Sequence, residues 1–167
     1  PDCIRALQLW CDDFVVRRFP VTVAEYLVFL NDLVIRSQED DALRAAPRQC
    51  GERPGDLGLL AVHRDERGHF LPGLDEYGAA VLEDRPVVMI DWFGARAYAA
   101  WYAARTRQPW RLLAELEYEK AARGVDGRYY PWGDFLDPSW CCMRLSHAGS
   151  AHLAAVDSYV VDCSPFG

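Results

Sequence analysis

The sequence predicts an irregular α+β domain with little regular secondary structure. Three segments, which begin near Thr22, Asp91 and Arg111, combine helical periodicity with cap residues. The rest of the chain alternates short apolar stretches with long loops rich in glycine, proline and charge. Its 167 residues, 51% apolar and 26% charged, suit a single globular domain. This order of elements favours α+β over a parallel α/β sheet.

The N-terminal part is expected to hold two short strands and the first helix. Apolar positions nearly alternate over residues 4–16 and are interrupted by Asp12–Asp13, which predicts two strands around a turn. Thr22 and Glu25 then form a T-x-x-E capping box, which satisfies free amides at a helix start. The helix should bury one face, made of Tyr26, Phe29, Leu30 and Leu33.

Residues 37–84 lose this periodicity and are predicted to form a long surface insertion. A short strand is expected at 59–62 or around 69–71. His63 and His69 flank a charged turn, which indicates a solvated hairpin. The acidic run at 39–41 is interpreted as a solvated face rather than a cation site.

The second and third helices follow in the next part of the chain. Residues 86–90 form an extended lead into a helix capped by Asp91, whose small alanines permit close packing. The third helix lies within 111–124, and Gly124 is expected just past its C-terminal end. Glu115, Glu117 and Glu119 point in different directions there, so paired-carboxylate chemistry is not expected. One further strand is predicted near 156–161.

The loop at 121–134 carries Tyr129, Tyr130 and Trp132 close behind two turn signals. Large rings are stable only where something covers them, so this loop either folds into the core or presents its rings to a ligand.

Charge and composition exclude two classes of partner. A net charge of -7 with scattered basic residues argues against nucleic-acid binding. No apolar run is long enough to cross a bilayer, so no membrane partner is expected and the chain should be soluble. Its arginine- and alanine-rich composition suggests a bacterial gene. Six cysteines without CxxC or zinc-like spacing are expected to be reduced thiols in the cytoplasm.

Four segments resemble, in the same order, the signatures of the formylglycine-generating enzyme family, also called sulfatase-modifying factor domains. They are FPVTVAEYLVFL at 19–30, RPVVMIDWFGARAYAAW at 85–101, RLLAELEYEKAARGVDGRYYPWGD at 111–134 and the closing SPFG. The resemblance implies a variant of the C-type-lectin-like fold, in which the YPWG loop folds inward as part of the core.

Three positions depart from the family pattern. Leu113–Ala114 replaces Pro-Thr, so the third helix loses its N-cap oxygen, at a cost of about 1 kcal/mol, and should be held by tertiary packing. Tyr118 replaces a tryptophan and should remain an aromatic core residue. Cys142 stands where calcium-binding members have an asparagine, and a thiol is a poor ligand for this hard cation.

The resemblance also implies where catalytic chemistry resides. Catalytic members oxidise a substrate cysteine with copper held by two cysteines near the C-terminal end of the domain, and none of the six cysteines here matches that pair. We therefore predict no catalytic residue, no metal ligand and no cofactor within this segment, copper or calcium belonging to the complete family domain. Residues 1–167 are expected to be one such domain, incomplete at its C-terminus.

Two functional hypotheses follow from these observations. The favoured one is a non-catalytic module that binds a protein or a small ligand, fused to another domain such as a bacterial signalling kinase. The alternative is part of a copper-dependent oxidase that converts a sulfatase cysteine to formylglycine, or the accessory domain of a related iron-dependent oxidoreductase. The predicted insertion and the missing asparagine favour the first, because loops on a rigid scaffold commonly carry binding.

The expected ligand surface lies in the loop-rich C-terminal stretch. Ser146–His147 and Ser150 with His152 lack a G-x-S-x-G elbow, so a hydrolase is not favoured and this stretch is interpreted as a surface loop. The candidate ligand-surface residues are Trp140, Arg144, His147 and His152.

Overall fold

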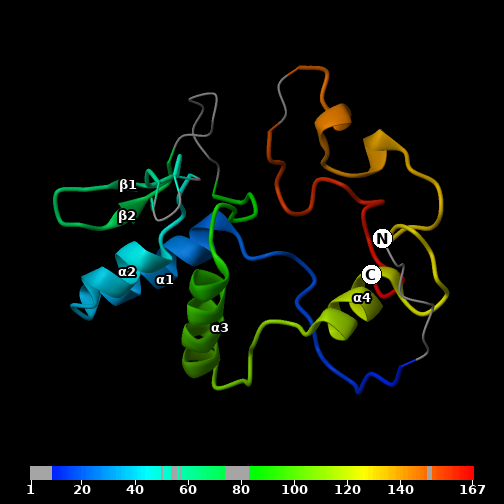
Figure 1. Ribbon diagram of the computed structural model, residues 1–167, viewed down its shortest axis with the longest axis horizontal. Helices are drawn as coiled ribbons and strands as arrows, with labels where there is room; N and C mark the ends of the chain where they lie inside the picture. The colour runs from blue at the N-terminus through cyan, green and yellow to red at the C-terminus, as the bar shows by residue number, and fades with distance from the viewer. Residues whose placement is uncertain (1–8, 50, 54–55, 57, 74–82, 150–151) are drawn as a thin grey trace.

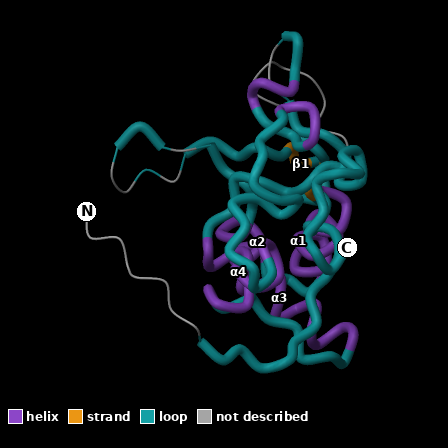
Figure 2. The backbone as a smooth tube through the Cα atoms, turned by 90° about the vertical axis from the view of Figure 1, so that its right-hand side faces the viewer, coloured by secondary structure: helices purple, strands orange, loops and turns teal. Residues whose placement is uncertain are grey.

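The computed structural model describes residues 9–49, 51–53, 56, 58–73, 83–149 and 152–167. Three helices and a small sheet gather in one part of the molecule, and α4 lies with the C-terminal loops in the other (Figure 1). Loops make up most of the path of the chain (Figure 2). Helices together with a two-stranded antiparallel sheet agree with the predicted α+β class. In the described residues, no helix is long and apolar enough to cross a membrane.

Helix α1 (Val23–Ile35) begins at the predicted capping box. The Glu25 N–H donates to Thr22 Oγ1 at 3.3 Å, and the Thr22 N–H donates to Glu25 Oε2 at 3.0 Å. These two bonds satisfy amides that a helix start leaves free. The predicted buried face is confirmed for Tyr26, Phe29 and Leu30, while Leu33 is half-buried.

Helix α3 (Trp92–Thr106) crosses α1 through aromatic rings. Asp91 Oδ1 accepts from the Gly94 N–H at 2.7 Å, which confirms the predicted cap. The Tyr98 ring stacks on Tyr26 at 5.5 Å and meets Phe29 edge-on at 5.7 Å. A Cβ at Gly94 would lie 2.8 Å from the Tyr26 hydroxyl, so only glycine permits this close approach.

Residues 37–84 are not simply a surface excursion, and that prediction is wrong for much of their described part. Residues 39–45 form helix α2 (Glu39–Ala45), and strands β1 (His63–Arg64) and β2 (Phe70–Leu71) form an antiparallel hairpin beside it. The Tyr26 hydroxyl donates to the Ala45 carbonyl at 2.8 Å, which links α2 to α1. Apolar side chains from this segment complete the core: Ala42, Ala45, Ala46, Val62 and Phe70 are all buried.

The hairpin agrees with part of the prediction for this region. Strand β2 confirms the expected strand around 69–71, whereas 59–62 contains only a single bridge between Leu60 and Arg48. His63 and His69 flank the turn as expected. Asp65 Oδ1 accepts from the Arg67 and His69 N–H groups there.

Two predicted strands are absent from the described residues. Residues 9–16 form no strand, while 1–8, where the first of the two would begin, lie outside the described part of the chain. Residues 156–161 form turns, in which Ser158 and Asp162 donate to carbonyls three residues earlier. Alternating apolar residues predict a strand only where a partner strand lies alongside.

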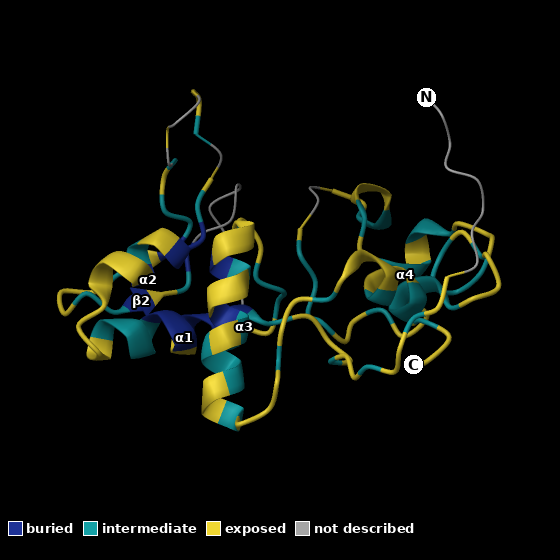
Figure 3. Cartoon of the chain, turned by 60° about the horizontal axis from the view of Figure 1, so that its bottom comes forward, coloured by how far each residue is buried: buried dark blue, intermediate teal, exposed yellow. Residues whose placement is uncertain are grey.

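Helix α4 (Glu115–Arg123) is less packed than predicted. It ends before Gly124, which has φ +71° and confirms the predicted cap, but none of its residues is buried. Tyr118 is 66% exposed, so its assignment to the core is wrong. The expectation that tertiary packing holds this helix is wrong as well. Figure 3 shows buried residues concentrated around α1 and α3 rather than α4.

The aromatic loop does not join the main core either. Tyr129 is 73% exposed, and Tyr130 and Trp132 are half-buried. These last two rings stack on each other at 5.5 Å, and Trp132 meets Trp140 edge-on at 6.3 Å. The rings cover one another in a separate small cluster, so the prediction that they fold into the core is wrong.

The hydroxyl that links α1 to α2 gives a test of this packing. Tyr26→Phe removes the side-chain donor to the Ala45 carbonyl at the end of α2, so the free energy of unfolding should fall by about 1–3 kcal/mol. Tyr118→Phe is the matched control, because its ring is mostly exposed and the change should stay within about 0.5 kcal/mol. Equal urea denaturation midpoints for the two variants would contradict the assignment.

Candidate functional site

A large cleft lies between the well-packed part of the fold and α4. Its volume is about 1500 Å³, and its walls come from residues 13–21, from α3, from 110–122 including part of α4, and from 156–167. Apolar side chains dominate these walls, among them Phe14, Tyr98, Ala99, Tyr102, Trp110 and Tyr118. Because the walls come from these four segments and from Tyr26, Val87 and Ile90, no single sequence motif marks this cleft.

The wall next to α3 is held by Arg17. Its guanidinium donates to Glu25 Oε1 at 2.7 Å and lies 5.7 Å from the centre of the Tyr102 ring. Burial, together with the Glu25 charge, raises the pKa of Tyr98 to about 12, so this hydroxyl is neutral at physiological pH. A cation and the neutral phenol of Tyr98 therefore line this side.

The α4 wall depends on one carboxylate. Arg111 donates to both Glu117 oxygens at 2.6 and 2.7 Å, and the Ala114 N–H donates to Glu117 Oε2 at 2.7 Å. The last bond is the half of the capping box that survives the loss of the N-cap oxygen. The Arg111 bonds, followed by that of Ala114, lower the pKa of Glu117 to about 2.

The N-terminal wall has a backbone without ladder partners among the described residues. There, the backbone of 9–20 makes no hydrogen bond to another backbone group. Lys120 holds this segment from α4, because its Nζ donates to the Cys11 carbonyl at 3.1 Å and lies 5.8 Å from the Phe14 ring centre. The Asp12 carbonyl accepts from Cys11 Sγ, while within the described residues the main-chain groups of 13–20, which line the cleft, remain for a strand partner.

Several apolar side chains at the cleft remain open to solvent. Val15, Tyr118, Val160 and Phe166 are each about two-thirds exposed or more, at 83%, 66%, 87% and 67%. Exposed apolar side chains that line one cleft are typical of interaction sites.

The predicted ligand surface lies outside this cleft and is only partly brought together. His147 and His152 have ring centres 4.0 Å apart. Trp140, at the end of the 3₁₀ turn Pro138–Trp140, packs against Trp132 and Phe135, and Arg144 is exposed at the start of the turn Arg144–Ser146. Cys142 also belongs to this neighbourhood, with Sγ 3.7 Å from His147 Nε2. Its contact with His147 depends on the turn at 141–146, so the sequence alone indicates only that Cys142 replaces a calcium ligand.

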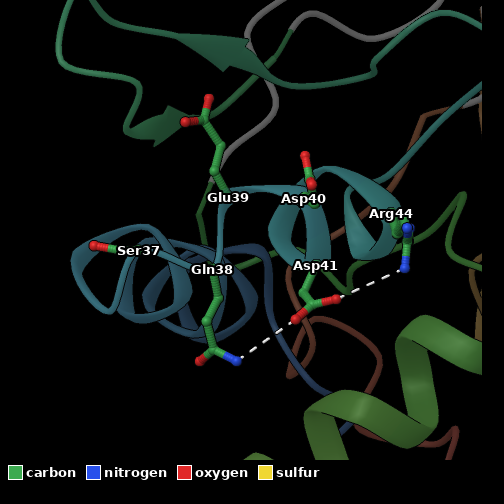
Figure 4. Close-up of a pocket in the computed structure, with 6 residues that line it drawn as sticks. All are labelled: Ser37, Gln38, Glu39, Asp40, Asp41 and Arg44. Carbon is green, nitrogen blue, oxygen red and sulfur yellow. Dashed lines mark hydrogen bonds and ion pairs between the residues drawn. The ribbon is translucent and has the colours of Figure 1, made fainter.

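The acidic run at the start of α2 behaves as a solvated face. Its side chains point in different directions (Figure 4), and Asp41 pairs with Gln38 and Arg44 at 3.5 and 3.9 Å. Glu39 pairs with Arg64 at 2.5 Å. Glu39 and Asp41 thus bind their own neighbours.

The family resemblance implies calcium and copper, and the donor atoms present show whether these metals fit. At Cys142 the neighbours are an imidazole nitrogen and a carbonyl oxygen, a donor set that does not fit calcium. Within the described residues, no three His, Cys, Asp or Glu side chains are grouped so as to hold a metal ion. We derive no step through calcium or copper.

Glu117 supplies a pH test of the α4 wall. Its pKa is lowered on folding, so the stability that it contributes is present above its ordinary pKa and is lost as pH falls through about 2. A carboxyl-carbon NMR titration should give a midpoint near 2, and Arg111→Gln should raise it toward the ordinary value. An unchanged midpoint in that variant would show that Arg111 is not the cause.

Comparison with known proteins identifies the family. A profile of the sulfatase-modifying factor enzyme 1-like domain matches residues 5–165. The chain is 32% identical over 167 residues to hercynine oxygenase of Mycolicibacterium smegmatis, covering 92% of this chain and 34% of that protein. It is 42% identical over 88 residues to formylglycine-generating enzyme of Streptomyces coelicolor, covering 46% and 26%.

A third relative is the uncharacterized protein YfmG of Bacillus subtilis, 27% identical over 157 residues, covering 94% of this chain and 26% of that protein. The chain thus spans about a third or less of the length of these relatives. Because the profile matches nearly every residue from 5 onward, the chain belongs to the sulfatase-modifying factor enzyme 1-like domain family.

Proposed function

We propose that this chain is a polypeptide-binding module of its family and that the cleft holds an extended, largely apolar segment. The observation that carries the proposal is the cleft of about 1500 Å³ beside residues 13–20, whose backbone makes no hydrogen bond to another described backbone group. In this proposal the chain supplies binding rather than chemistry, since none of its six cysteines matches the pair that the family resemblance implies for copper.

The size of the cleft favours a polypeptide over a small molecule. Pockets for small ligands and cofactors usually measure about 300–1000 Å³, and this cleft is larger. Its exposed apolar residues come from both ends of the chain, as Val15 and Val160 illustrate. An occupant that covers both must be long, and an extended segment meets that requirement.

The backbone of 13–20, which pairs with no other described backbone group, favours an extended conformation of that occupant. A peptide that adds as a strand gains main-chain hydrogen bonds, while alternate side chains enter apolar pockets. Residues 13–20 offer such main-chain groups, and Tyr102, Trp110 and Tyr118 offer ring surfaces opposite them. Tyrosine and tryptophan are the residue types that most often anchor such interfaces.

The proposal also covers the fold of the module, its location and the domain to which it is attached. The family membership supports a C-type-lectin-like fold, in which variable loops surround a fixed core. We place the module in the bacterial cytoplasm, attached to a further domain such as a signalling kinase.

Peptide selection tests the cleft directly. A library of random peptides of about 12 residues is selected on the immobilised chain, and we expect apolar, extended sequences. Tyr118→Arg should weaken the selected peptides at least tenfold, because it removes an aromatic anchor worth about 2 kcal/mol or more and places a charge in the cleft.

The matched control is Tyr129→Arg, which makes the same change at a similarly exposed tyrosine outside the cleft and should leave affinity unchanged. The double variant Arg144→Ala with His147→Ala separates the cleft from the other candidate surface. Binding that survives Tyr118→Arg but is lost in the double variant would place the ligand at Trp140, Arg144, His147 and His152 and refute the cleft.

A second candidate function is a structural part of an oxygen-using enzyme. The alignment with hercynine oxygenase favours it, because that alignment covers 92% of this chain. Oxygen uptake by the complete natural gene product, with hercynine or a cysteine-containing peptide as substrate, tests this alternative. Substrate-dependent uptake would establish the oxygenase or oxidase, and the same rate without substrate would exclude it for these two compounds.

A further inference from the structure

A thiol and an imidazole lie side by side in the loop after the first 3₁₀ turn. Cys142 is exposed, and its Sγ lies 3.7 Å from His147 Nε2 and 3.4 Å from the His152 carbonyl oxygen, to which it donates. Neither side chain lines the cleft. Tyr159, which does line it, interacts with Cys142, so the pair borders the proposed polypeptide site.

The local fold positions the two side chains. The Ser146 hydroxyl lies within hydrogen-bond reach of the Pro138 and Cys141 carbonyl oxygens, to which its one proton donates, and its Oγ accepts from the Met143 N–H at 3.1 Å. These contacts close the turn between residues 138 and 146. The turn brings residue 147 back beside residue 142, so the pair does not depend on distant parts of the fold.

The pair has the composition of an activated thiol. A thiolate is the reactive form of cysteine, and an imidazole within reach can take the thiol proton as the sulfur attacks. The other described thiols differ in their surroundings. Cys141 is half-buried, and burial raises the pKa of its thiol. Cys163 is exposed like Cys142, which makes it a control within the same chain.

We propose that Cys142, with His147 as its base, is a thiol–disulfide exchange site that takes small disulfides. The Cys142 S–H turns from the His152 carbonyl toward His147, and Sγ attacks one sulfur of R–S–S–R while its proton passes to His147 Nε2. A Cys142–S–S–R bond forms, the original S–S bond breaks, and the leaving RS⁻ takes the proton from His147. One disulfide is consumed and one thiol is released, so no further oxidant is required. A second small thiol reverses the reaction.

The modification would change the surface that carries it. The mixed disulfide removes the thiol proton that Cys142 donates to the His152 carbonyl. The added group would lie beside His147 and His152, on the predicted ligand surface. Thiol redox state would then alter the shape of that surface without touching the core.

The experiment uses the intact chain with all cysteines present and a limiting amount of 5,5′-dithiobis(2-nitrobenzoate), an aromatic disulfide. Sites of modification are assigned by fragment mass spectrometry after short reaction times at pH 7. Cys142 should be modified about tenfold faster than Cys163, and the difference should shrink at pH values above the ordinary thiol pKa of about 8.5, where thiols ionise without a base. In concentrated urea the two cysteines should react at similar rates.

The role of His147 has its own readout. His147→Ala should slow modification of Cys142 about tenfold and leave Cys163 unchanged, and added imidazole should restore part of the lost rate. Rescue by imidazole distinguishes a base from a purely structural side chain. His147→Gln is the second variant, which retains polarity and similar volume if alanine disturbs the loop. Equal rates for Cys142 and Cys163 in the folded wild-type chain, or no effect of either substitution, would overturn the proposal.

Discussion

The packing of α1 against α3 is the interaction on which the rest of the structure depends. Tyr26 and Tyr98 stack across the contact, and Gly94 allows the two helices to approach closely enough for this. The Tyr26 hydroxyl then fixes the end of α2 through Ala45, so one aromatic contact organises three helices. Both tyrosines also line the cleft, which means that the core and the candidate site share the same residues.

The two sides of the cleft are stabilised by different forces. The α3 side belongs to the buried aromatic core, whereas α4 has no buried residue and relies on Glu117, Arg111 and the glycine cap at Gly124. Segments with little buried apolar area open at low free-energy cost. The α3 side is therefore fixed, whereas the α4 side is more easily displaced. This combination is suited to admitting a long ligand. In our proposal, the backbone of 13–20, which pairs with no other described backbone group, sets the direction along which that ligand binds.

Local features such as helix caps could be predicted from the sequence, whereas the exposure of Tyr118, the cleft and the Cys142–His147 pair could not. Thr22, Asp91 and Gly124 were found as caps because a cap depends on residues only a few positions away. Tyr118 was placed in the core because an aromatic at that position of a helix is typical of a buried face, yet nothing described covers it. The cleft and the Cys142–His147 pair depend on chain path and turn geometry, which hydrophobic periodicity does not encode.

Amide hydrogen exchange tests the central claim most directly, because it reports where backbone groups are unpaired and where a ligand covers them. In the free chain, amides of 9–20 should exchange rapidly while those of α1 are protected. With a selected apolar peptide bound, we expect protection to appear at 9–20 and along α4, and little change in α2 or the hairpin. Strong protection of 9–20 before any peptide is added, or new protection confined to 140–152, would contradict the assignment of the cleft as the binding site.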